Sequence, residues 1–223
     1  MSNYYHGAKA SKQATSVSTP VVADSSIHLI VGAAPVHTVG GKANEPVYAS
    51  NYAEAVAAMG YSDEWDKYDI CEEIYSSFKL YSNGPIIMVN VLDPAKHLKG
   101  AETVEKTLAG GITELPYEAV SDTVEVKGYD GEDSLTEAYT RGEDYDLFYT
   151  DGVLRLERIE SGKIKADNAR LNIKFNSVDP SKVTKKDIIG GYDTNTNKSS
   201  GFELVDSVSV SYTHLRAHET LAN

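Results

Sequence analysis

The sequence predicts an α/β main domain with a mixed sheet and crossover helices, an inserted all-β sandwich-like domain and an extended N-terminal arm. Three observations support this prediction. Two apolar runs, at 27–31 and 85–92, enclose two patterns of helical period. Short alternating segments separated by turn residues fill the stretch from 96 to 187. Residues 1–26 are rich in Ser, Thr and Ala and show no helical period.

We therefore divide the chain into five parts. They are an extended arm at 1–26, the first part of the α/β domain at 27–98, the inserted β domain at 99–185, the return to the α/β domain at 186–209, and a tail at 210–223. The string SYTHLRAHET in that tail resembles translated sequencing-adapter read-through at the ends of metagenomic gene fragments. We expect the tail to be non-native and the α/β domain to be truncated before it.

The two apolar runs read as buried strands. Ile27–Val31 meets Gly32-Ala33-Ala34-Pro35, a sequence of turn residues that stops a strand. Pro85–Leu92 is almost continuously apolar, which is typical of a strand covered on both faces and flanked by parallel neighbours. A strand, two helices and a second strand form a crossover connection, which is right-handed by default.

Both helices between these strands have a predicted cap and a predicted apolar face. Ser50 is the expected cap of the first helix, which ends at Gly60 and has one face formed by Tyr52, Ala53, Val56 and Ala57. Asp66 is the expected cap of the second helix, in which apolar side chains recur every four residues, at Ile70, Ile74 and Phe78. Asn83-Gly84-Pro85 ends that helix.

The segment from 99 to 185 has the pattern of strands with one buried face. Asp146–Arg158 predicts a hairpin that turns at Asp151-Gly152, the strongest short-range hairpin signal. Ala169–Val178 predicts a half-buried strand that points Leu171, Ile173 and Phe175 inward. Ser121–Lys127 supplies a further strand. A small sandwich or barrel with a polar outer face follows.

Composition and charge exclude several classes of function. The chain has 223 residues, a hydrophobic fraction of 41% and a formal net charge of −12, so neither nucleic-acid phosphate nor an anionic membrane is an expected partner. No apolar run approaches the length of a membrane span, and residues 1–18 lack the apolar core of a signal peptide. We expect cytoplasmic synthesis. Cys71 lies on the apolar side of the second helix among carboxylates, a setting that predicts an inert thiol.

Four sets of residues match a functional motif only in part. Gly40-Gly41-Lys42 lacks the first glycine and the Ser/Thr of a phosphate-binding loop. Asp193, Asn195 and Asn197 copy the opening of an EF-hand loop, but Lys198 replaces the obligatory glycine and Leu204 the closing glutamate, so a polar hairpin is expected. The other two are the acidic set Asp130, Glu132 and Asp133, without ligand spacing, and His214 with His218, without a third ligand. We predict no catalytic, cofactor-binding or metal-binding residue and no cofactor.

Three stretches, taken in order, resemble the contractile tail sheath proteins of bacteriophages and phage-tail-like particles. They are IVGAAP at 30–35, NEPVYASNYAEAVAAMG at 44–60 and NGPIIMVNV at 83–91. The most specific match is IIGGYDTNTNKSSGFELVDSV at 188–208, which resembles the family's return to its main domain. GEDYDLFYTDGVLRLERIESGKI at 142–164 resembles the outward-facing β-sandwich domains of phage tail proteins.

The resemblance implies a structural role without enzymatic activity. A sheath subunit forms a helical polymer around an inner tail tube and contracts to drive the tube through a cell envelope. Its partners are other sheath subunits, the inner tube, the baseplate and the tail terminator. It is located in the virion tail sheath and assembled in the bacterial host cytoplasm. The residues alone favour a frayed terminus at 1–26 over an arm that adds a strand to a neighbouring subunit, but the family resemblance implies the arm, which knits subunits together.

Two other functions fit parts of the sequence. The α/β crossover suits an enzyme that binds a small ligand at the carboxyl ends of the strands, with residues 32–41 as the binding loop. The β domain suits a surface-binding tail module that recognises a carbohydrate or a cell-surface partner. The first lacks an identifiable base or nucleophile, and the second lacks a clustered aromatic platform inside the β segment.

Overall fold

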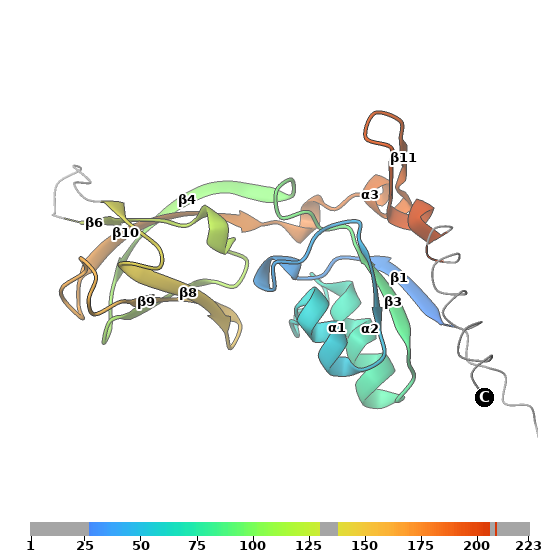
Figure 1. Ribbon diagram of the computed structural model, residues 1–223, viewed down its shortest axis with the longest axis horizontal. Helices are drawn as coiled ribbons and strands as arrows, with labels where there is room; N and C mark the ends of the chain where they lie inside the picture. The colour runs from blue at the N-terminus through green and yellow to red at the C-terminus, as the bar shows by residue number, and fades with distance from the viewer. Residues whose placement is uncertain (1–26, 130–137, 206–207, 209–223) are drawn as a thin grey trace, which may run out of the picture.

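A computed structural model describes residues 27–129, 138–205 and 208 of this chain. Figure 1 shows two parts side by side along the long axis, one with helices packed on a sheet and the other built of β-strands. We call them the α/β part and the β part. The predictions for the arm at 1–26, the acidic set at 130–133 and the tail at 210–223 fall outside the described residues. The assignment of the β part as an inserted domain stays an interpretation.

The α/β part is built on a three-stranded sheet of order β1-β3-β2, formed by β1 (His28–Gly32), β3 (Ile86–Asn90) and β2 (Pro46–Ala49). Strand β3 is central and fully buried, but only β1 runs parallel to it, and β2 is antiparallel. The expectation of parallel neighbours was therefore wrong on one side. Sequence analysis missed β2, because a four-residue edge strand that begins with proline carries little periodicity.

Helix α1 (Tyr52–Met59) begins one residue later than its predicted cap implies. The side chain of Asn51, not Ser50, accepts a hydrogen bond from the Glu54 amide, while the Glu54 carboxylate accepts from the amide and hydroxyl of Ser50. The predicted apolar face was also wrong in part. Ala55 and Met59 are buried, whereas Ala53 and Ala57 are exposed. The helix therefore packs on the sheet through the face that carries Ala55 and Met59.

Helix α2 (Asp69–Tyr75) continues into a π-helical turn, η2 (Ser76–Leu80). It starts at Asp69 after Tyr68, so the prediction of Asp66 as its cap was wrong. The Asp69 carboxylate accepts from the Ile70 amide at 3.1 Å and so serves its own first turn. The predicted row of Ile70, Ile74 and Phe78 is confirmed, since it packs on the face of the sheet formed by Ile86 and Met88.

The opposite face of the sheet is covered by the last described segment. Val31, Val89 and Val91 cluster there with Leu204, against Val183 and Ile188. This segment comprises η4 (Pro180–Lys182), α3 (Lys185–Ile189), the hairpin of β11 (Gly191–Asp193) and β12 (Lys198–Ser200), and η5 (Gly201–Leu204). The polar hairpin expected around Asp193–Asn197 is therefore present.

The β part consists of two antiparallel sheets. One has the order β4-β10-β6-β7, formed by β4 (Leu98–Thr107), β10 (Arg170–Val178), β6 (Glu125–Gly128) and β7 (Ala138–Tyr139). The other has the order β5-β9-β8, formed by β5 (Ile112–Pro116), β9 (Val153–Arg158) and β8 (Tyr145–Thr150). In place of the strand predicted from Ser121, residues Ser121–Thr123 form a 3-10 turn, η3, and β6 begins only at Glu125.

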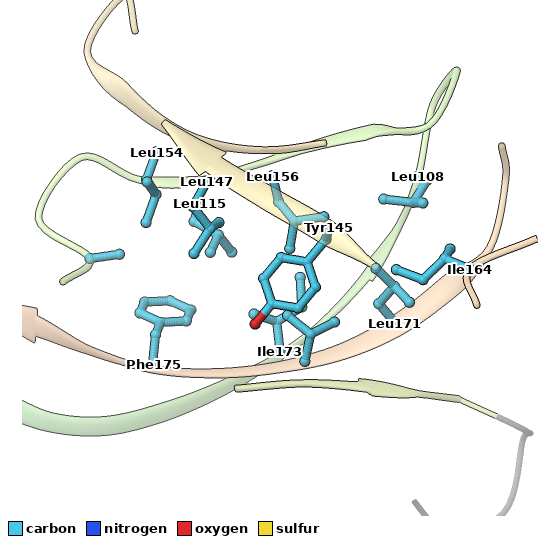
Figure 2. Close-up of a cluster of buried hydrophobic side chains, with 12 residues drawn as sticks. Leu108, Leu115, Tyr145, Leu147, Leu154, Leu156, Ile164, Leu171, Ile173 and Phe175 are labelled. Atoms are coloured by element: carbon cyan, nitrogen blue, oxygen red, sulfur yellow. The ribbon is translucent and has the colours of Figure 1, made fainter. Parts of the chain in front are cut away.

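The side chains between these two sheets form one apolar core, shown in Figure 2. Leu171, Ile173 and Phe175 point into it from β10, as their alternation predicts. The β8–β9 hairpin turns at Asp151 and Gly152, which both have positive φ, 47° and 76°, the conformation that a tight two-residue hairpin turn requires. This hairpin prediction is confirmed.

Candidate functional site

The carboxyl ends of β1 and β3 are where an open α/β sheet usually binds a ligand. Here the chain's own side chains occupy that position. The Ala33 amide donates to Asp69 Oδ1 at 2.6 Å, and the Ala34 amide donates to Asn90 Oδ1 at 2.9 Å. A Cβ on Gly32 would lie 2.5 Å from Asp69 Oδ1, so this glycine leaves room for a carboxylate of α2. The amides that would cradle a ligand are satisfied internally.

Asn90 is the centre of this network. Its side chain is fully buried, at 0% exposure, and Oδ1 accepts a second hydrogen bond from the Leu92 amide at 3.1 Å. Its amide nitrogen donates to the Leu92 carbonyl at 2.8 Å. Three backbone groups beside β1 and β3 thus depend on one side chain. In the sequence, Asn90 is the lone polar residue within the run Ile86–Leu92, a signal that could have marked it as a buried hydrogen-bonding residue.

The Gly40-Gly41-Lys42 segment lies outside this network. The Gly41 amide donates to the Val36 carbonyl at 2.9 Å and closes a turn that follows the 3-10 helix η1 (Val36–Thr38). Lys42 is exposed and lies 3.4 Å from the Glu45 carboxylate. The two features that suggested a phosphate-binding loop therefore serve a turn and a surface ion pair.

The Asp193 carboxylate is also engaged within its own hairpin. Oδ1 accepts from the Asn195 amide at 2.9 Å and Oδ2 from the Thr196 hydroxyl at 2.8 Å. These hydrogen bonds, chiefly the one from the Asn195 amide, lower the pKa of Asp193. Asn197 has a positive φ of 56° and accepts from the Tyr192 hydroxyl. Among the described residues, no group of three His, Cys, Asp or Glu side chains is placed to hold a metal ion.

Chemically distinctive side chains do gather where the two parts of the chain meet. Six buried residues there form what we call the junction cluster: Ala33, Tyr68, Cys71 and Leu92 from the α/β part, with Val120 and Val178 from the β part. Burial raises the pKa of the Cys71 thiol to about 11, so it stays protonated at neutral pH and acts as an apolar side chain.

Polar contacts surround the junction cluster. His37 Nε2 lies 2.9 Å from the Tyr117 carbonyl, and the Tyr117 hydroxyl donates to the Tyr61 carbonyl at 2.8 Å. Lys67 forms an ion pair with Glu118 at 2.7 Å. Sequence analysis did not place these residues together, since they come from separate segments whose proximity is a tertiary property. The junction holds two parts of the chain against each other.

Among the described residues, no helix is both long and apolar enough to cross a membrane. No protein-family model matches this sequence, and no solved structure matches it. A curated protein named Tail sheath protein, from Burkholderia phage BcepMu, is 30% identical to this chain over 190 residues. The match covers 84% of this chain and 37% of the phage protein, so the chain spans somewhat more than a third of its relative. The resemblance seen in the sequence is thereby confirmed: over most of its length this chain is similar to a phage tail sheath protein.

Proposed function

We propose that this chain is part of a structural subunit of a contractile tail sheath, which polymerises with its own copies around an inner tail tube. Its other partners are the baseplate and the tail terminator, and it is located in the virion tail after assembly in the host cytoplasm. The observation that supports this proposal best is the 30% identity to the tail sheath protein of phage BcepMu over 84% of the chain.

The geometry of the described residues supports a role without catalysis. The strand ends that bind ligands in many α/β proteins are occupied here by hydrogen bonds to Asp69, which is partly buried, and to Asn90, which is fully buried. The lone cysteine is a buried, protonated thiol. A sheath works by switching between two packings of identical subunits, and heterologous contacts that do not close a ring generate the helical lattice. Such a lattice requires subunits that stay folded and surfaces that bind one another in a defined way.

Electron microscopy of a lysate that expresses the intact gene tests this proposal. We expect long, hollow, striated tubes, because sheath subunits assemble into a helical lattice. A soluble, folded product that never forms tubes, alone or with the tail tube and baseplate of the same particle, contradicts the sheath proposal. A lysate that instead acquires a glycosidase, esterase or nucleotidase activity supports the enzyme alternative.

A further inference from the structure

His37 is a buried, titratable residue that the proposed function does not use. It lies in η1, which begins four residues after the end of β1, and only 7% of its surface is exposed. Its ring meets the rings of Tyr117 and Tyr149 edge-on, with centroids 5.8 Å and 5.7 Å away. Both tyrosines belong to the β part, so this histidine of the α/β part is inserted into the surface of the other part.

The hydrogen bonds of His37 define its protonation state. Nε2 faces the Tyr117 carbonyl at 2.9 Å, and because a carbonyl only accepts, Nε2 carries the hydrogen. Nδ1 is buried and has no hydrogen-bond partner among the described residues. A proton added at Nδ1 would therefore form a charged, buried group with an unpaired donor, a costly state. Burial accordingly lowers the pKa of His37.

The groups around His37 offset only part of the cost of a buried charge. Tyr117 and Tyr149 are neutral at physiological pH, and burial raises the pKa of both. Among the described residues, Glu118 is the carboxylate that acts on His37, and its favourable effect is smaller than the cost of burial. That carboxylate is already paired with Lys67 at 2.7 Å. The free-energy cost of a protonated His37 is therefore reduced most by exposing its ring to water.

Separating the two parts would expose the ring. Each part has a hydrophobic core of its own, one between the sheets of the β part and one between the helices and the α/β sheet. The contacts that separation breaks are those of the junction, including the bond from Tyr117 to the Tyr61 carbonyl. We propose that the junction is an acid-sensitive latch, in which protonation of His37 at Nδ1 releases segment 117–121 of the β part from the α/β part.

The sign and size of the effect follow from proton linkage. The released histidine has its ordinary pKa near 6.5 and the docked one a lower value, so the released state binds more protons. Docking is fully stable above about pH 6.5 and weakens as pH falls below it, until the pH reaches the docked pKa. One proton changes the docking equilibrium by at most about tenfold per pH unit.

Fluorescence of Trp65, the chain's single tryptophan, is the test. Trp65 packs against the junction cluster, so release should hydrate the indole and shift its emission to the red. We expect a reversible shift between pH 7.5 and 5 with unchanged far-UV circular dichroism. His37→Gln keeps a donor for the Tyr117 carbonyl but cannot be protonated, and we expect it to abolish the shift.

His97→Gln is the matched control. His97 is also buried, at 5% exposure, but its Nδ1 accepts from the Asp93 amide at 2.9 Å and its Nε2 lies 3.9 Å from Asp187. This variant should retain the shift. A shift that persists in His37→Gln, disappears only in His97→Gln, or is absent from the native chain overturns the proposal.

Hydroxyl-radical footprinting of side chains on the native chain decides the matter if His37→Gln does not fold. Acidification from pH 7.5 to 5 should raise the labelling of Tyr68 and Tyr117, whose side chains lie at the junction. Tyr145, which lies in the core of the β part, should stay protected. Unchanged labelling of Tyr68 and Tyr117, or an equal rise at Tyr145, refutes the latch. Tube formation at pH 7.5 does not depend on this result, so the sheath proposal is judged separately.

Discussion

Replacing Asn90 by alanine is the sharpest test of how the α/β part is held together. The change removes one side chain and leaves three buried backbone groups without partners, namely the Ala34 amide, the Leu92 amide and the Leu92 carbonyl. Each unsatisfied buried group costs about 1–3 kcal/mol. Partial relaxation makes the sum smaller than three full penalties, and we expect the free energy of unfolding to fall by about 3–6 kcal/mol.

Urea unfolding followed by circular dichroism measures this loss, with the slope of the transition checked for two-state behaviour. Asn195→Ala is the control, because Asn195 is exposed and the backbone amide that is its main donor to Asp193 is retained in alanine. It should change stability by less than about 0.5 kcal/mol. A fall in the free energy of unfolding of less than about 1 kcal/mol for Asn90→Ala would show that these hydrogen bonds do not hold the strand ends together.

Three further predictions concern other elements. Gly32→Ala should destabilise the chain, because the new Cβ would lie 2.5 Å from Asp69 Oδ1, and the loss should be smaller in an Asp69→Ala background, as a double-mutant cycle of unfolding free energies would show. The Asp187 carboxylate accepts from Thr184 and is near Lys96, which lower its pKa to about 2, so its contribution to stability is present above about pH 4 and is lost as pH falls toward 2. Asp187→Asn should flatten stability over this range in acid-unfolding curves, and an unchanged profile would refute the assignment. Deleting residues 1–22 from the intact gene should abolish tubes in electron micrographs with little change in thermal unfolding of the subunit, whereas tubes formed equally well without them would favour the frayed-terminus reading.

Local sequence determined the elements whose pattern and turn chemistry agree. The β8–β9 hairpin is an example, since Asp151-Gly152 tolerates the positive φ that a tight turn needs and the flanking residues alternate. The buried row on β10 is another, because side chains on a strand alternate between two faces. The row Ile70, Ile74 and Phe78 on α2 and η2 follows from helical period alone.

Only the tertiary structure decided how these elements meet. The start of α2 and the edge strand β2 depend on backbone partners that lie far away in sequence, whereas the cap of α1 is a choice between the adjacent residues Ser50 and Asn51. Asp69 reaches a loop 36 residues away, and Asn90 binds an amide 56 residues away. His37 reads as an ordinary loop residue until segment 117–121 packs over it, 80 residues further along the chain. Periodicity reports what a residue's own helix or strand requires, and burial by a distant segment leaves no local pattern to detect.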